Sequence, residues 1–112
     1  MPEQFDQNLP SNQRKLDLVE DLLKVASDAG CSLTHMAMAF VVQHPAVTAA
    51  IIGPRTMEQL TDLLAGHDVR LDDSILDRVD EVVAPGTNIG SGDAGYVAPA
   101  VASAWRRRRG LR

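Results

Sequence analysis

The 112-residue sequence contains little cysteine and few aromatic residues. Its one cysteine, Cys31, excludes an intramolecular disulfide bond and fits a reducing compartment, so we expect a cytoplasmic location. Aromatic residues make up 4% of the chain, and any hydrophobic core must therefore be aliphatic. No apolar run approaches the roughly 20 residues of a membrane-spanning helix, and the polar, acidic amino terminus is unlike a signal peptide. We therefore expect no membrane partner.

The formal net charge of −4 is unevenly distributed along the chain. Residues 106–112 contain five arginines and no acidic residue, whereas the rest of the chain carries 6 basic and 15 acidic side chains, a net charge of −9. A nucleic-acid-binding domain spreads its positive charge over a folded face. An acidic body with a short basic end therefore predicts no nucleic-acid partner.

Apolar periodicity and turn residues divide the chain into three parts. We expect a loop or linker over residues 1–10, a single partial domain over 11–86 and a flexible tail with a basic end over 87–112. Within the domain the pattern predicts helices over residues 12–29, 33–44, 57–65 and 74–84. The expected amino-terminal caps are Ser11, Ser32, Thr56 and either Asp72 or Asp73.

Two further features of these helices are predicted. Gly30 should end the first helix in a left-handed conformation. Apolar residues at helical spacing should face a core, among them Leu16, Val19 and Leu23 in the first helix and Leu64 in the third.

One segment, about residues 46–52, is predicted to form a β-strand. Its sequence, Val47-Thr48-Ala49-Ala50-Ile51-Ile52, does not alternate apolar and polar residues, which is typical of a parallel strand covered on both faces. Such a strand needs neighbours for its backbone hydrogen bonds, and the sequence offers no second strand of comparable strength. We infer that the strand pairs across an oligomer, or that the rest of its sheet lies on other polypeptide and the chain is incomplete.

The turn after this strand has the features of an anion site. Gly53 allows close approach to the backbone, and Thr56 with Gln59 forms the pattern of a capping box at a helix start. The first N–H groups of that helix carry partial positive charge, and Arg55 adds a full one. The alternative is an ordinary strand-to-helix connection that binds nothing.

The remaining candidate residues fit structural roles better than chemical ones. His35, His44 and His67 are not spaced with Cys31 as zinc ligands are, so we predict no metal site. The acidic residues of the last predicted helix fit a cap and a solvated face.

Five stretches, residues 32–41, 44–48, 51–60, 68–72 and 76–82, together resemble the carboxyl-terminal part of aldo-keto reductases in order and spacing. The longest match around the turn is Ile51-Ile52-Gly53-Pro54-Arg55-Thr56-Met57-Glu58-Gln59-Leu60. The resemblance implies an α/β fold: the carboxyl-terminal portion of a (β/α)8 TIM barrel, mostly helical here, with one main strand at about 46–52. Barrel enzymes bind ligands at the carboxyl ends of their strands, often with a phosphate near the last two.

The resemblance also implies NADPH as the cofactor and a carbonyl compound as the substrate of a full-length form. It places Gly53, Arg55 and Thr56 against the 2′-phosphate on the adenosine side of NADPH, with Pro54 as a further cofactor-binding residue. Gln59 would contact the ribose or the adenine. We expect this chain alone to bind NADPH weakly or not at all, because most of the cofactor's contact surface would lie elsewhere.

The catalytic residues that the resemblance implies, a tyrosine, a lysine, an aspartate and usually a histidine, have no match here. The only tyrosine is Tyr96 in the tail, and the only lysines are Lys15 and Lys24 on the first predicted helix. We therefore assign no catalytic residue and expect the chain to be inactive alone, with exposed apolar faces that favour self-association. The alternative is a small helical interaction module that dimerises through its unpaired strand and carries an arginine-rich tail.

Overall fold

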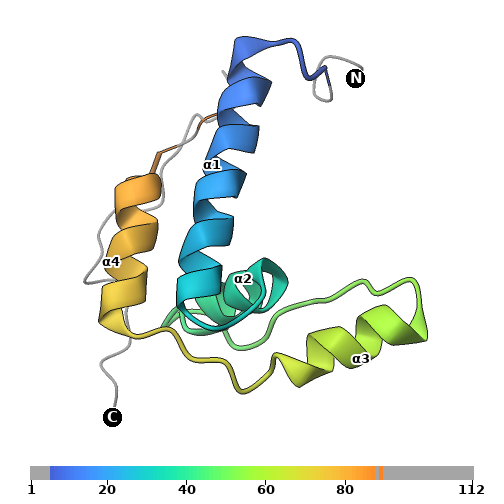
Figure 1. The fold of residues 1–112 in the computed structure, drawn as a ribbon. Helices are drawn as coiled ribbons and strands as arrows, with labels where there is room; N and C mark the ends of the chain where they lie inside the picture. The colour runs from blue at the N-terminus through green and yellow to red at the C-terminus, as the bar shows by residue number, and fades with distance from the viewer. Residues whose placement is uncertain (1–5, 88, 90–112) are drawn as a thin grey trace.

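The computed structural model describes residues 6–87 and residue 89, and in this part the chain forms four helices (Figure 1). They are α1 (Pro10–Asp28), α2 (Leu33–Val42), α3 (Met57–Ala65) and α4 (Asp73–Val82). Helix α4 lies beside α1 and runs in the opposite direction, and α2 crosses at the carboxyl end of α1. Helix α3 stands apart, between two long connections. Tyr96 and the arginine run of the predicted tail lie outside the described residues.

Three of the predicted caps are confirmed. The Ser32 hydroxyl accepts from the N–H of His35 at 3.1 Å, and the Thr56 hydroxyl accepts from the N–H of Gln59 at 3.2 Å. The Asp72 carboxylate accepts from the N–H of Ile75 at 2.9 Å. Each cap satisfies a backbone donor that has no partner inside its own helix. These helix starts are therefore set by local sequence.

The predicted cap of the first helix is wrong. Helix α1 begins at Pro10, and the residue before it, Leu9, makes no side-chain cap. Proline is well suited to the first helical position because its fixed φ matches the helix and its missing N–H would have no intrahelical partner there. At the other end of α1, Gly30 has a φ of 72°, which confirms the predicted left-handed stop.

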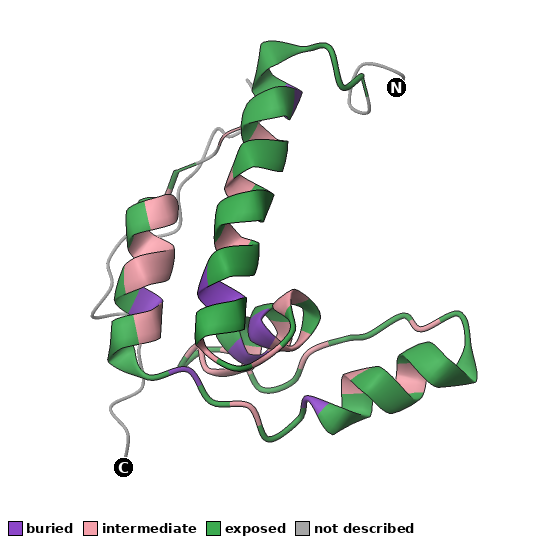
Figure 2. Ribbon diagram, viewed as in Figure 1, coloured by how far each residue is buried: buried purple, intermediate pink, exposed green. Residues whose placement is uncertain are grey.

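The hydrophobic core is small and aliphatic. It lies where the carboxyl half of α1 meets α2, α4 and the connection before α4 (Figure 2). Its buried members are Val25, Ala26, Met36, Ala39, Leu71 and Leu76. Because these residues come from three helices and one connection, burial of their side chains holds α1, α2 and α4 together.

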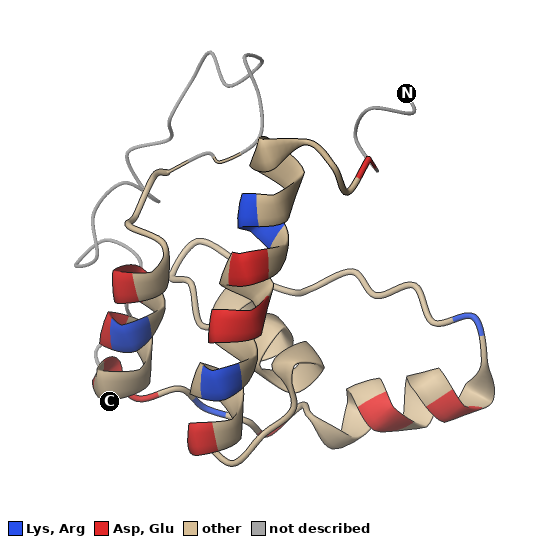
Figure 3. Cartoon of the chain, turned by 45° about the horizontal axis from the view of Figure 1, so that its top comes forward, with Lys and Arg blue, Asp and Glu red and all other residues tan. Residues whose placement is uncertain are grey.

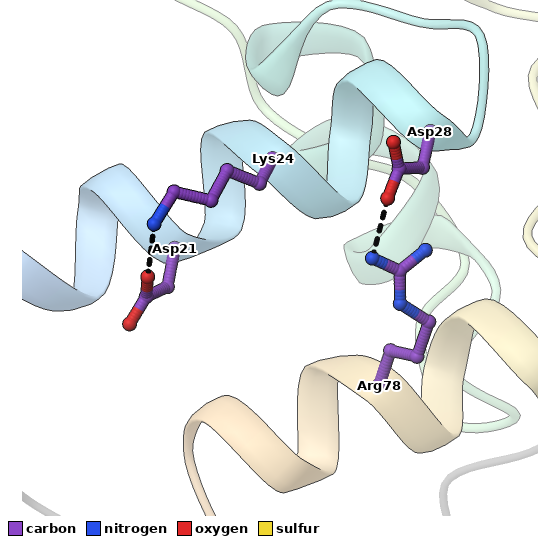
Figure 4. Close-up of polar contacts among 4 residues, drawn as sticks. All are labelled: Asp21, Lys24, Asp28 and Arg78. Carbon is purple, nitrogen blue, oxygen red and sulfur yellow. Dashed lines mark hydrogen bonds and ion pairs between the residues drawn. The ribbon is translucent and has the colours of Figure 1, made fainter.

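Polar contacts fix the connection around Leu71 and the pairing of α1 with α4. The side-chain amide of Gln43 accepts from the N–H of Leu71 at 2.7 Å and donates to its carbonyl at 2.8 Å. Arg78 of α4 donates to Asp28 of α1 at 2.6 Å (Figure 4). Both partners of this ion pair are exposed, and such pairs contribute at most about 1 kcal/mol. The ion pair therefore orients the two helices more than it stabilises them.

The predicted strand at about 46–52 is not found: the part of the chain that the structure describes contains no β-strand. The segment instead forms part of the long connection between α2 and α3 (Figure 1). The side chain of Ile51 is fully exposed, and Thr48 and Ala49 are exposed as well. A strand exists only when its N–H and C=O groups pair with a neighbouring strand, and the described residues provide none.

Several helices present large apolar side chains to solvent. Sequence periodicity predicted Leu16, Val19 and Leu23 of α1 to face a core, but all three are exposed. Leu64 of α3, also predicted to face inward, is exposed as well. The other large exposed apolar side chains are Leu9, Phe40, Val41, Ile51, Ile52 and Met57. The apolar surface predicted from the sequence is thus larger than the surface that the four helices can bury against one another.

No single helix among the described residues is long and apolar enough to cross a membrane. Helices α1 and α2 together reach the length and composition of a span, but the two are bent by 87° at the break between them.

The Asp72 cap makes the stability of α4 dependent on pH. Hydrogen bonds from the Ser74 hydroxyl and then from the Ile75 N–H hold the pKa of Asp72 below its usual value. A carboxylate with a lowered folded pKa stabilises the fold above its unfolded pKa of about 3.9 and loses that contribution as the pH falls through the folded pKa.

We expect Asp72→Asn to retain the cap, because an amide oxygen also accepts from the N–H, and to remove its titration. The difference in free energy of unfolding between wild type and variant should be constant above about pH 5. As the pH falls below about 4, the wild type should lose stability relative to the variant, because only the wild-type carboxylate becomes protonated. Urea melts followed by circular dichroism measure this difference. A difference that is independent of pH over the whole range would show that the cap does not titrate in this way.

Candidate functional site

The candidate anion site, residues 53–59, lies at the far end of the connection that leads from α2 to α3 (Figure 1). It is remote from the small core, and none of the residues of α3 is buried. The position of the site therefore depends on the connection and on the contacts of α3 with neighbouring residues, and only weakly on burial of apolar side chains.

A hydrogen-bonded ring closes the turn at the start of α3. Thr56 accepts from the N–H of Gln59 through its hydroxyl, as in a capping box. The Gln59 side chain reaches back further than in the usual box: its Oε1 accepts from the N–H of Arg55 at 2.8 Å. Gln59 thereby fixes the backbone of Arg55 and leaves its own side-chain NH₂ as the group that can donate to a ligand.

The charges around the turn are of both signs. Arg55 is exposed, and the connection from α2 to α3 shows basic colour only at the bend before α3 (Figure 3). The first turn of α3 also contains Glu58, whose carboxylate is favourable near the positive end of the helix dipole but repels a second anion. The site therefore combines one full positive charge and the helix amino end against one acidic side chain.

Gly53 leaves the turn open. A Cβ added at this position would meet nothing within 4 Å, so the backbone there is accessible to a ligand from that side. Gly53 does not have a positive φ, and its role in the turn is therefore not a left-handed conformation. Pro54 follows it and is half-buried. The structure thus brings Arg55, Thr56 and Gln59 into one hydrogen-bonded unit and places Gly53 and Pro54 directly before it.

The three histidines contact different parts of the chain. His44 accepts from the N–H of Ala46 through Nδ1 at 3.1 Å, and Nδ1 of His67 lies 2.8 Å from the carbonyl oxygen of Leu64. His35 lies against α3, with Nε2 at 2.8 Å from the carbonyl oxygen of Asp62. Among residues 6–87 and 89, no three side chains of the His, Cys, Asp or Glu type come together as metal ligands do.

Cys31 and the two lysines also take part in local structure. Cys31 is half-buried and packs against the core. Lys15 donates to Asn12 at 3.2 Å, and Lys24 donates to Asp21 at 2.8 Å (Figure 4). The bond to Asp21 raises the pKa of Lys24 above its usual value. Both lysines belong to α1 and none of their contacts involves the turn.

The contact between His35 and Asp62 is a feature near the site that sequence reasoning missed. The two residues are 27 positions apart and belong to different helices. Periodicity and capping rules act over three or four residues, so no local pattern indicates such a contact.

Comparisons with known proteins point to one family. The sequence model that describes the aldo/keto reductase family matches residues 1–84. The chain is 34% identical over 74 residues to a Bacillus subtilis (strain 168) protein described as an uncharacterized oxidoreductase, YrpG. That match covers 66% of this chain and 22% of the Bacillus protein, so the chain spans about a fifth of its relative's length. No solved structure matches the chain significantly.

The cap at Thr56 sets the helical content of α3. Thr56→Ala removes the acceptor for the N–H of Gln59 and should destabilise α3 by about 1 kcal/mol. Because no residue of α3 is buried, this loss should appear as fraying of α3 and not as global unfolding. Carbon-13 chemical shifts of residues 57–65 measure the helical population.

Thr61→Ala is the matched control, since Thr61 bonds only to the carbonyl of Met57 within the same helix. Alanine has the higher helix propensity, so this variant should keep or increase the helicity of α3. Equal helicity in wild type and Thr56→Ala would contradict a role for the cap.

Proposed function

The chain belongs to the aldo/keto reductase family, and we propose that its turn at residues 53–59 contributes the adenosine-phosphate end of an NADPH site in a carbonyl-reducing oxidoreductase. The observation that carries this proposal is the hydrogen-bonded unit of Arg55, Thr56 and Gln59 at the amino end of α3. Helix amino ends with an adjacent arginine favour phosphate groups.

The residues present fit a phosphate better than they fit an uncharged ligand. Arg55 supplies a guanidinium whose planar donors match phosphate oxygens, and its backbone position is held by Gln59. The open space at Gly53 admits a ligand close to the main chain. Glu58 in the first turn opposes an anion, and this opposition is consistent with weak binding by the isolated turn.

In this proposal the chain's own residues bind and orient one end of the cofactor. NADPH, when bound, would supply the hydride for reduction of a carbonyl group. Arg55 and Thr56 would hold the 2′-phosphate, and the side-chain NH₂ of Gln59 would donate to the ribose or the adenine. None of these groups acts on the substrate.

Carbonyl reduction would need residues that this chain does not supply. The curated relative is matched over 22% of its length, so its whole activity cannot be carried over. The tyrosine and lysine that reduction would require have no matching position here. We therefore infer that the 112-residue chain does not reduce aldehydes with NADPH. The family match also favours this interpretation over a helical interaction module.

The exposed apolar side chains of α1, α2 and α3 support a further expectation about the isolated chain. Surfaces of this kind are normally covered, and proteins that leave them exposed tend to associate. We infer that self-association of this chain is driven by these faces and increases with concentration.

The phosphate site is tested with 2′,5′-ADP, which carries the adenosine 2′-phosphate of NADPH without the nicotinamide. We expect saturable shifts of the amide resonances of residues 55–59 with a Kd in the millimolar range, about −4 kcal/mol. Arg55→Ala should weaken this binding roughly 5- to 10-fold because it removes a charge-assisted contact.

Arg70→Ala is the matched control. Arg70 lies beyond the other end of α3, where its guanidinium donates to the carbonyl groups of His67 and Val69. This variant should bind 2′,5′-ADP as the wild type does, and 5′-AMP should bind the wild type more weakly than 2′,5′-ADP. If 5′-AMP and 2′,5′-ADP bind equally, or if Arg55→Ala has no effect, the proposed phosphate site is wrong.

A further inference from the structure

Helix α3 is held to the rest of the molecule by few contacts. None of its residues is buried, and the helices that pack closely in the described part are α1 with α4 and α1 with α2. Two long connections lead to α3 and away from it (Figure 1). Its carboxyl end is different, because the capping residue Gly66 is buried. The orientation of α3 must therefore be set at this end.

His35, in the first turn of α2, makes the contact at this end of α3. Its side chain is 16% exposed, and its Nε2 lies 2.8 Å from the carbonyl oxygen of Asp62 and 3.2 Å from Asp62 Oδ1. A carbonyl oxygen only accepts, so Nε2 must carry the proton. The carbonyl groups of a last helical turn carry partial negative charge, which makes them good acceptors for such a donor.

The imidazole ring of His35 packs directly on the backbone of Gly66. A Cβ at this position would lie 2.5 Å from Cδ2 and 2.6 Å from Cγ of His35, which is too close for any real contact. The φ of Gly66 is −83°, a value that all residues adopt, so the backbone conformation does not require glycine. The close approach of the ring does require it. At Gly53, in contrast, an added Cβ would meet nothing.

We propose that His35 is a positioning residue. Its ring packs on Gly66, and its Nε2–H donates to the carbonyl of Asp62, so that α3 keeps one orientation relative to α2. This contact holds the amino end of α3, with Arg55 and Thr56, in the arrangement that receives a phosphate. The part of the inference that concerns the phosphate rests on the proposed function, whereas the part that concerns the orientation of α3 does not.

The orientation of α3 is measured by residual dipolar couplings of the amides of α2 and α3 in the 112-residue chain. In the wild type, one alignment tensor should fit both helices. In His35→Ala the couplings of α3 should shrink two-fold or more while those of α1, α2 and α4 stay unchanged. His35→Gln should restore part of the effect, because the glutamine side chain has a donor at a similar distance from the backbone.

Two further variants make the test specific. His67→Ala removes a histidine that bonds to the carbonyl of Leu64 within its own segment, and it should leave the couplings of α3 unchanged. Gly66→Ala keeps His35 but displaces the ring, and it should reproduce the effect of His35→Ala. It also provides a second test if His35→Ala does not fold.

Binding of 2′,5′-ADP gives the functional readout. His35→Ala should weaken it roughly 3- to 10-fold, the effect of one lost hydrogen bond, although His35 does not belong to the turn. If the wild type does not bind 2′,5′-ADP, the proposed function fails, and the dipolar couplings still decide the role of His35. Unchanged couplings of α3 in both His35→Ala and Gly66→Ala would overturn the inference. If the wild type binds 2′,5′-ADP, equal affinity of His35→Ala and wild type would overturn it as well.

Discussion

The structure depends on a simple constraint: a β-strand forms only where its backbone N–H and C=O groups pair with those of a neighbouring strand. Residues 46–52 have the composition of a strand covered on both faces, yet the described part of the chain places no strand beside them, and Ile51 is fully exposed. The segment therefore acts as a long connection. Because this connection leads to α3, the missing pairing also separates α3 and its turn from the core.

The same constraint explains the distribution of apolar surface. The described helices bury a core of six residues, while Leu16, Val19 and Leu23 of α1 stay exposed on another face. The aldo/keto reductase family implies a TIM barrel, in which the helices pack on strands, and the described residues contain no strand that could cover this face. The exposed apolar face of α1 is consistent with membership of that family.

Features encoded within a few residues could be predicted from the sequence, and features that need distant partners could not. The caps at Ser32, Thr56 and Asp72 and the left-handed Gly30 depend on neighbouring residues and occur as predicted. The predicted strand was wrong because a strand needs a neighbouring strand, and residues 6–87 and 89 contain none. At the candidate site, Thr56 and Gln59 were predicted as a box, and the bond from the Arg55 N–H to Gln59 is a local variant of it that the usual pattern does not specify. The packing of His35 on Gly66 joins separate segments and depends on three-dimensional placement.

The most direct test of this account is amide hydrogen exchange at residues 48–52 of the 112-residue chain, measured by NMR at several protein concentrations. An unpaired segment predicts exchange at rates close to those of an unstructured peptide, while the core amides of α1 and α4 stay protected. Protection of residues 48–52 in the monomer at the level of the core helices would contradict the account, because it would show that the segment has strand partners within this chain.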